Sequence, residues 1–355
     1  MNFPNKYINR CLDLAHRGIG STSPNPSVGA VIVDAQGRII GEGWTSPYGG
    51  AHAEVNAINA VKSEDVPLLQ TSTIYVTLEP CFHFGKTPPC VDLILRSKIP
   101  HVVVAYIDPF PEVAGKSIEK LRQNGVEVEV LVLTQRQVTP SSSLLPFFTN
   151  IAQKRPYIIL KWAETADGFI GQSDKAIAIS NVYVKRLVHK WRSEADAIMV
   201  GTETAALDNP ELTNRYYYGK SPKRIVIDRQ RRLSEKLHLF DGSIETFIYT
   251  EGGTSNAHFD NFHNFNYRFV AFDDNFLNTI LADLYTQKIG ILFVEGGARL
   301  LNTFITKGLW DEARVFVASK NPVIKNGIQA PKLPFDYLDR KVQIIDNQLL
   351  VFRNA

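Results

Sequence analysis

Cysteine, net charge and long apolar runs are all scarce in this 355-residue chain. Three cysteines, an odd and small number, argue against a disulfide framework. The 39 basic and 36 acidic residues leave a formal charge of +3, which is too balanced to indicate a nucleic-acid scaffold. No stretch approaches the roughly 18 to 20 apolar residues that span a bilayer, and the N-terminal residues lack an apolar signal core. We therefore expect a cytoplasmic protein that binds neither nucleic acid nor membrane.

The length and the 44% content of hydrophobic residues predict two domains. Up to residue 133, helical and strand patterns alternate, which predicts an α/β layer sandwich about one mixed sheet. Residues 134–156 resemble a linker followed by a short docking helix, and we place the domain boundary between residues 148 and 149. Alternation then begins again, so the second half is predicted to be another α/β domain, with no internal repeat relating it to the first.

The periodicity also predicts where the individual elements lie. In the first half, strands are expected at 29–34, 73–78, 102–107 and 126–133, and helices near 3–17, 52–61, 90–97 and 115–124. In the second half, strands are expected at 157–163, 197–201, 224–228, 291–294, 314–319, 342–346 and 349–352, and helices near 181–193, near 274–287 and directly after Gly297.

Two short motifs in the first half together indicate a catalytic metal site. AHAEVNAI places His52 and Glu54 at the start of a predicted helix, and EPCFHFGKTPPC supplies Cys81 and Cys90. One imidazole and two thiolates make a three-ligand zinc site whose fourth position stays open for water or substrate. Glu54 would then move protons for the bound water, as in zinc nucleobase deaminases, although the cysteines here are further apart than in their usual signature.

Other interpretations of these motifs remain open. With His83 as a fourth ligand, the zinc site would be closed and structural. A zinc-containing nucleic-acid-binding module or a nucleic-acid deaminase would share the motif, but either would need a basic binding surface. Cys11 lies in an amphipathic helix without a partner motif, so we expect it to be a small buried residue.

Longer segments resemble the bifunctional riboflavin-biosynthesis deaminase/reductases. In the first half the resemblance is carried by SPNPSVGAVIV, GEG, AHAEVNAI, YVTLEPCFHFGKTPPC and DPFPEVAGK, and in the second by YIILKWAETADGFI, AIMVGTETAALDNPELTNR and ILFVEGGARLLNTF. The resemblance implies a cytidine-deaminase-like α/β/α sandwich in residues 1–148 and a dihydrofolate-reductase-like α/β domain in residues 149–355.

The resemblance also implies two reactions, one zinc ion per chain and NADPH as cofactor. The first reaction would be hydrolytic deamination of 2,5-diamino-6-ribosylamino-4(3H)-pyrimidinone 5′-phosphate, and the second would reduce the ribosyl side chain to ribityl. A homo-oligomer, dimer or tetramer, is expected. The alternative is a deaminase that carries an inactive reductase-like domain.

Most of the remaining site residues are assigned by this resemblance. No G-x-G-x-x-G follows a strand, so Gly296 and Gly297, between a predicted strand and helix, are the candidates for presenting backbone N–H groups to an anion. Arg192 and Arg215 suit a substrate phosphate because a guanidinium binds its oxygens in pairs, and Asp208 would assist proton transfer. The predicted substrate contacts are Asn25, His83, Lys86, Arg192, Leu212, Arg215 and Glu295, and the predicted cofactor contacts are Lys161, Glu164, Thr204, Asp208, Gly296, Gly297, Ala298, Arg299 and Leu300.

The residue patterns alone also allow ordinary roles at several of these positions. Asn25 could form an Asx turn, Lys86 could be solvated, and Asp208 could lie in a polar turn. The chain also departs from the family pattern. Thr45 stands where a histidine is usual, Ala178 replaces a tryptophan expected near the nicotinamide, and DPFPEVAGKS differs from the usual DPNP and GKG.

Overall fold

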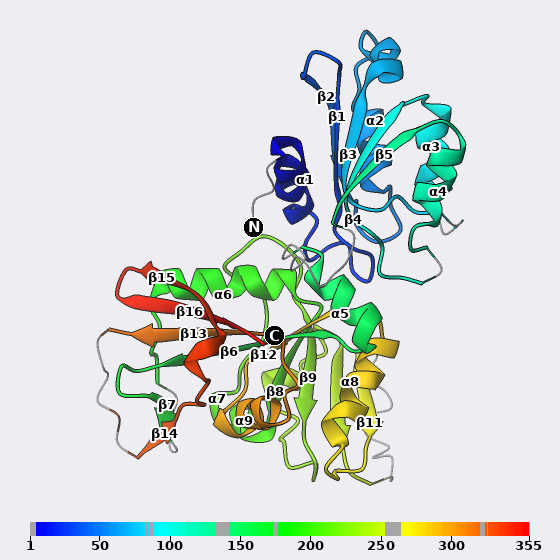
Figure 1. The fold of residues 1–355 in the computed structure, drawn as a ribbon. Coiled ribbons are helices and arrows are strands. Elements are labelled where there is room, and N and C mark those ends of the chain that lie inside the picture. The colour runs from blue at the N-terminus through cyan, green and yellow to red at the C-terminus, as the bar shows by residue number, and fades with distance from the viewer. Residues whose placement is uncertain are drawn as a thin grey trace. The chain divides into compact units, whose positions relative to one another are not determined.

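The computed structural model describes residues 5–82, 84, 88–111, 113–132, 143–172, 177–252, 264–319, 324 and 326–354. The chain divides into two compact units, residues 1–154 and 155–355 (Figure 1). A boundary after residue 148 would fall inside helix α5 (Leu145–Gln153), whose Phe148 packs into the core of the first unit. Among the described residues, no helix has the length and apolar character needed to cross a membrane.

The first unit is built on a five-stranded mixed sheet in the order β2-β1-β3-β4-β5. Strand β1 runs antiparallel to β2 and β3, whereas β3, β4 and β5 are parallel to one another. The strands are β1 (Gly29–Val33), β2 (Ile39–Trp44), β3 (Thr73–Leu78), β4 (His101–Tyr106) and β5 (Glu127–Val132), and the other helices are α1 (Lys6–His16), α2 (Ala53–Asn59), η1 (Val66–Thr71), α3 (Cys90–Arg96) and α4 (Lys116–Gln123).

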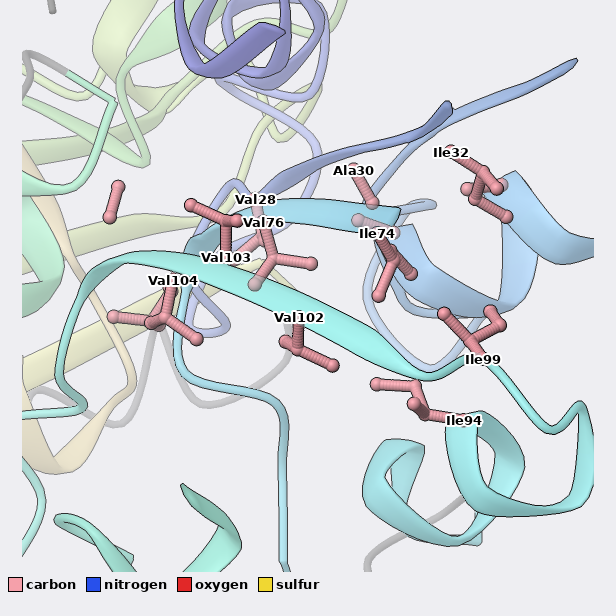
Figure 2. Close-up of a cluster of buried hydrophobic side chains, with 14 of the residues drawn as sticks. Val28, Ala30, Ile32, Ile74, Val76, Ile94, Ile99, Val102, Val103 and Val104 are labelled. Atoms are coloured by element: carbon pink, nitrogen blue, oxygen red, sulfur yellow. The ribbon is translucent and has the colours of Figure 1, made fainter. Parts of the chain in front are cut away.

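Alternate side chains of β1 enter two different cores, because successive residues of a strand point to opposite faces. Ala30 and Ile32 join the main cluster, which includes residues of α2, α3 and α4 (Figure 2). Val31 and Val33 lie with Cys11 of α1 on the other face. Both faces of the sheet are therefore covered, as the predicted sandwich requires, and Cys11 is the buried residue that was expected.

The second unit contains a nine-stranded sheet in the order β11-β10-β9-β8-β12-β6-β13-β16-β15. Seven strands from β11 to β13 are parallel, and β16 and β15 continue the sheet antiparallel. A separate pair is formed by β7 and β14. The strands are β6 (Tyr157–Glu164), β7 (Phe169–Gln172), β8 (Ala197–Gly201), β9 (Lys223–Ile227), β10 (Thr246–Thr250), β11 (Phe265–Phe269), β12 (Ile291–Val294), β13 (Glu312–Ala318), β14 (Gly327–Gln329), β15 (Leu338–Ile344) and β16 (Asn347–Arg353).

The central parallel strands position the polar residues that follow them. The apolar runs of β6, β8 and β12 are almost entirely buried, as expected for parallel strands covered on both faces. Their carboxyl ends, with that of β9, meet at one edge of the sheet, where ligands bind in open α/β sheets. The helices are α6 (Val182–Glu194), α7 (Thr202–Asp208), η2 (His238–Phe240), α8 (Phe276–Thr286), α9 (Ala298–Thr306) and η3 (Phe335–Tyr337).

Every strand and helix predicted from the sequence is present, with ends a few residues from those expected, so the two-domain α/β class is confirmed. Within the described residues, nine elements were not predicted. Strand β2 contains two glycines and β11 is only partly buried, so both lack a clear strand pattern. The remaining seven are β7, β10, β14, α7 and the short 3-10 helices η1, η2 and η3.

Candidate functional site

The three predicted metal ligands of the first unit lie together. His52 Nδ1 is 3.5 Å from Cys81 Sγ and 3.4 Å from Cys90 Sγ, and the ligand atoms all lie within 4.8 Å of one another. A tetrahedral zinc ion with ordinary Zn–S and Zn–N bonds would separate its nitrogen and sulfur ligands by roughly 3.6 Å. The spacing and the donor set therefore fit zinc, and within the described residues no other histidine, cysteine or carboxylate joins this cluster.

Secondary structure brings these ligands together from distant parts of the sequence. His52 is the N-cap of α2, Cys81 follows β3, and Cys90 is the first residue of α3. The backbone N–H of Cys90 donates to Cys81 Sγ at 3.1 Å, and the contact with the Cys90 thiol lowers the pKa of Cys81. A thiolate is thus already favoured at Cys81, and the thiolate is the form that binds metal.

Two glycines of β2 allow α2 to approach the sheet. A Cβ atom at Gly43 would overlap Ala57 N and Ala53 O of α2, and one at Gly41 would overlap Ala57 O. Neither position tolerates a side chain without moving the helix. The GEG segment therefore fixes the height of α2, and with it His52, above the sheet.

Glu54 lies in the first turn of α2, beside the cluster, and is almost fully buried. Burial raises the pKa of Glu54 to about 7, and the negative charge of Cys81 adds to this effect. A carboxyl group in this state can both accept and donate a proton near neutral pH. The placement agrees with the role predicted for Glu54.

Glu79 is a buried residue next to the site that the sequence analysis missed. Its carboxylate accepts hydrogen bonds from Gly115 N at 2.9 Å, Ser117 N at 3.2 Å and Ser117 Oγ at 2.6 Å. These contacts join the end of β3, just before Cys81, to the start of α4. Ser117 is part of the departure from the GKG pattern, and its hydroxyl supplies one of the donors. The only sequence signal was a carboxylate directly after a buried strand.

The other predicted residues of the first unit differ in how far they can be placed. Asn25 is half-buried in a bend whose backbone N–H donates to Thr22 O at 2.9 Å. His83 and Lys86 lie outside the described residues. Thr45 is buried, and its hydroxyl accepts from Val28 N at 3.0 Å, so it supports the backbone rather than facing a ligand as a histidine would.

The second unit contains a cavity of about 1990 Å³ at the carboxyl edge of the parallel strands. This volume exceeds that of ordinary small-molecule pockets and suits a dinucleotide together with a substrate. The predicted residues that line it are Lys161, Arg192, Thr204, Asp208, Arg215, Glu295, Gly296, Gly297, Ala298, Arg299 and Leu300.

A buried charge cluster forms one wall of this cavity. Arg192 donates to both carboxylate oxygens of Glu295, at 3.0 and 2.9 Å, and Lys161 Nζ lies 3.9 Å from the same carboxylate. Burial would raise the pKa of Glu295, but the two cations outweigh it and lower that pKa to about 2. Burial also lowers the pKa of Lys161. Glu295 is therefore an anion between two cations.

The glycine pair after β12 comes close to α7. Gly297 is the N-cap of α9, and a Cβ atom there would lie 3.0 Å from Thr204 Oγ1. A side chain at Gly296 would press against Leu300. Because Gly296 and Gly297 have no side chains, the N-terminus of α9 is accessible from the cavity. A helix N-terminus is a suitable binding site for an anion.

Two predicted residues do not line the cavity. Leu212 is only 2% exposed, and Glu164 is half-buried and accepts from Trp162 Nε1 at 2.7 Å. Ala178 does line it, so the wall lacks the indole of the family pattern at that point. His189 and Arg229 also line the cavity and were not predicted, because nothing in their local sequence marks them.

The two units match two different families. Residues 1–106 match the cytidine and deoxycytidylate deaminase zinc-binding region, and residues 156–322 match the RibD C-terminal domain. The chain is 36% identical to the riboflavin biosynthesis protein RibD of Aquifex aeolicus, over 98% of this chain and 97% of that protein. It is 35% identical to the protein of the same name from Bacillus amyloliquefaciens, over 92% and 86% of the two chains.

A solved structure is similar over the same extent. The diaminohydroxyphosphoribosylaminopyrimidine deaminase/5-amino-6-(5-phosphoribosylamino)uracil reductase of Thermotoga maritima superposes with a TM-score of 0.85 and 32% identity, over 98% of each chain. Sequence, domain content and fold therefore agree, and the chain belongs to the RibD family of bifunctional deaminase and reductase enzymes of riboflavin biosynthesis.

Proposed function

We propose that the first unit hydrolytically deaminates 2,5-diamino-6-ribosylamino-4(3H)-pyrimidinone 5′-phosphate and that the second unit reduces the ribosyl group of the product to ribityl with NADPH. One observation carries this proposal: each unit contains its own site with the chemistry its reaction needs. The first has three zinc ligands beside a buried carboxyl, and the second has a cavity of about 1990 Å³ with a buried charge cluster.

In the deaminase, His52, Cys81 and Cys90 would hold zinc, which supplies a Lewis acid that makes a water molecule nucleophilic at neutral pH. Glu54 accepts the proton that this water loses. It passes this proton to the ring nitrogen, then takes the proton of the hydroxyl that is now bonded to the ring carbon and gives it to the departing amine, which leaves as ammonia while the carbon becomes a carbonyl. The burial of Glu54 keeps bulk water away from these transfers.

In the reductase, NADPH supplies the hydride, and the residues of the chain bind and orient the two molecules. The glycine pair and the N-terminus of α9 support a cofactor phosphate. Arg215 forms an ion pair with Glu211 but is 43% exposed in its side chain and can turn toward the substrate phosphate. Arg192 gives three of its five N–H groups to Glu295 and Thr213 O and keeps two for the same phosphate. Asp208 lines the cavity and is our candidate for proton transfer.

Two further properties belong to the proposal. We place the protein in the cytoplasm, a location supported by its three cysteines, none of which is in a disulfide. A homo-oligomer, dimer or tetramer, is the expected assembly, and light scattering after size-exclusion chromatography measures it.

The two half-reactions can be tested separately with one pair of variants. Glu54→Gln should retain zinc but release ammonia at least about 100-fold more slowly, because the glutamine amide cannot accept the proton. Its oxidation of NADPH with pre-deaminated substrate should equal that of the wild type. Glu42→Gln, which only breaks a surface pair with Arg10, is the matched control.

Each outcome bears on one half of the proposal. Undiminished ammonia release by Glu54→Gln would exclude Glu54 from proton transfer. Failure of the wild type to oxidise NADPH with the deaminated intermediate would show that the second unit is an inactive reductase-like domain.

A further inference from the structure

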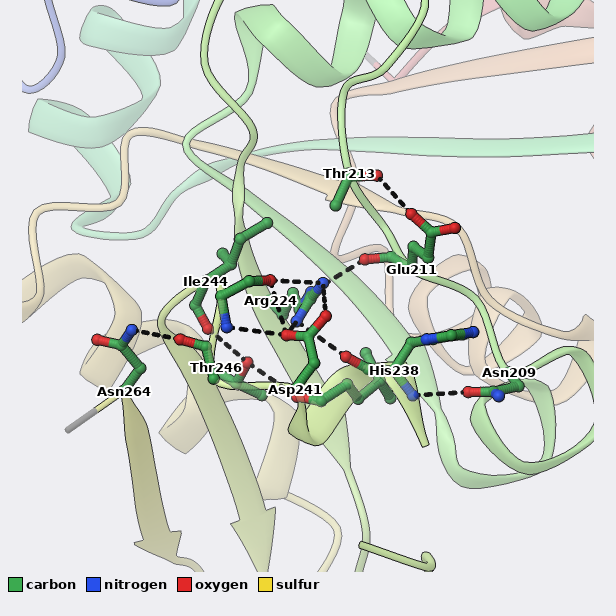
Figure 3. A network of polar contacts seen from close by, with 12 residues as sticks. Asn209, Glu211, Thr213, Arg224, His238, Asp241, Ile244, Thr246 and Asn264 are labelled. Atoms are coloured by element: carbon green, nitrogen blue, oxygen red, sulfur yellow. Dashed lines mark hydrogen bonds and ion pairs between the residues drawn. The ribbon is translucent and has the colours of Figure 1, made fainter. Parts of the chain in front are cut away.

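Arg224, on the parallel strand β9, is fully buried, which is unusual for an arginine. Its guanidinium forms a two-pronged ion pair with Asp241, at 2.7 and 3.3 Å (Figure 3). Burial would raise the pKa of Asp241, but Arg224 and Ser243 hold it well below its ordinary range. The pair is thus charged, and a buried guanidinium is tolerated only when its donors are satisfied.

Two further hydrogen bonds of Arg224 reach two separate loops. Nε donates to Glu211 O at 3.0 Å, and Nη1 donates to His238 O at 3.0 Å (Figure 3). A second contact joins the same two loops, because His238 N donates to Asn209 Oδ1 at 2.8 Å. Arg224 therefore fastens residues 209–215, which follow α7, to the start of η2.

Residues 209–215 need such fastening. They form no regular element, and both Asn209 and Leu212 have positive φ angles, 40° and 52°. A left-handed conformation is unfavourable for a residue such as leucine and persists only when surrounding contacts enforce it. The Leu212 side chain is buried, and the carbonyl just before it is the one that Arg224 holds.

The same segment bears directly on the reductase cavity. Arg192 Nη1 donates to Thr213 O at 3.0 Å, and Arg215 N donates to His189 Nδ1 at 2.9 Å. Two arginines thus hold the carbonyls on either side of Leu212: Arg224 from the interior and Arg192 from the cavity. A shift of the segment would change the position of Arg192 and Arg215 together.

We propose that Arg224 is a positioning residue of the reductase site, which holds residues 209–215 so that Arg192 and Arg215 face the phosphate of the substrate. Arg224 itself does not line the cavity, so it acts only through this segment. The inference rests on the reductase activity proposed above, and it explains how Leu212 can matter for substrate binding while its side chain is buried.

The test is steady-state kinetics of the reductase step with Arg224→Met, which retains the apolar volume but none of the donors. We expect the KM for the deaminated intermediate to rise about tenfold or more, because small displacements of binding groups have large effects. The KM for NADPH should change less than about twofold, since the glycine pair and α9 are joined to this segment only indirectly, through the Glu295–Arg192 pair among the described contacts. Ammonia release by the first unit should stay at the wild-type rate.

A matched control separates positioning from lost stability. Arg155→Met breaks another two-pronged ion pair of the same unit, which Arg155 forms with Asp311 at 2.6 and 2.8 Å. Neither of these two residues lines the cavity. It should leave both KM values unchanged. Equal KM values for the intermediate in Arg224→Met and Arg155→Met would overturn the proposal, whereas an inactive wild type would instead overturn the proposed reductase function.

A milder variant covers the case in which Arg224→Met does not fold. Asn209→Gly keeps the left-handed backbone and removes only the contact with His238 N. It should raise the KM for the intermediate severalfold and leave the KM for NADPH unchanged. An unchanged KM for the intermediate in this folded variant would also overturn the proposal.

Discussion

Replacing Glu295 by glutamine tests how much stability the buried charge cluster gives the reductase unit. Each pKa unit corresponds to about 1.4 kcal/mol. The lowering of the Glu295 pKa from 4.5 to about 2 therefore corresponds to about 3 kcal/mol of folding free energy at neutral pH. The side chain is 13% exposed, so solvent screening reduces this only slightly.

Glu295→Gln removes this contribution and leaves Arg192 and Lys161 without their shared counter-charge. Breaking a buried pair in this way costs about 3–5 kcal/mol. Lys161, whose pKa burial already lowers, can release its proton in the variant and so limit the loss. We expect the free energy of unfolding to fall by about 3 kcal/mol at pH 7.

The pH dependence has a definite sign. Because the folded pKa of Glu295 is lowered, its contribution is complete above the unfolded value of 4.5 and is lost as the pH falls toward 2. The difference between wild type and Glu295→Gln should therefore shrink as the pH falls below 4.

Urea unfolding followed by tryptophan fluorescence measures this difference, since Trp162, Trp191 and Trp310 are three of the four tryptophans and all lie in the second unit. Glu194→Gln is the control, because it breaks only a surface pair with Lys190 and should cost less than about 1 kcal/mol. A loss below 1 kcal/mol in Glu295→Gln, or a difference that does not change down to pH 3, would refute the reasoning.

Two further predictions concern the deaminase unit. In Gly43→Ala, the new methyl group should overlap Ala53 and Ala57 and displace α2, and with it the zinc ligand His52. Elemental analysis of the purified variant should therefore find less zinc than in the wild type, and full zinc occupancy would contradict the role given to this glycine. Glu79→Gln should lower the free energy of unfolding by about 1–3 kcal/mol, because the amide nitrogen cannot accept the hydrogen bonds that Ser117 donates, and thermal unfolding of the zinc-loaded protein measures it. Wild-type stability in that variant would show that the carboxylate is dispensable.

Local pattern was enough to predict most of the fold and the metal ligands. Most strands and helices have a clear hydrophobic periodicity in the sequence. His52, Cys81 and Cys90 are residue types that bind zinc, and few other roles explain why they occur together in these motifs. Strand β2 was missed because its glycines lower strand propensity, although the missing side chains are what lets α2 pack there.

What could not be predicted depends on pairs that only the tertiary structure brings together. Arg192 and Glu295 are 103 positions apart, and neither residue type indicates its partner. Arg224 sits at the start of an apolar run, where a partly exposed arginine is the ordinary expectation, and its burial follows from Asp241 and two carbonyls in other loops. Glu79 likewise depends on Ser117 of a later helix.

Among the described residues, the metal ligands lie between positions 52 and 90 and the cavity is lined by residues between 161 and 328, so each site is built within its own unit. A lesion in one site therefore leaves the other chemically complete. Two alleles, one defective at each site, should complement each other in a cell, with the intermediate diffusing from one protein molecule to the next. Selection can thus act on either activity alone, even though a single gene encodes both.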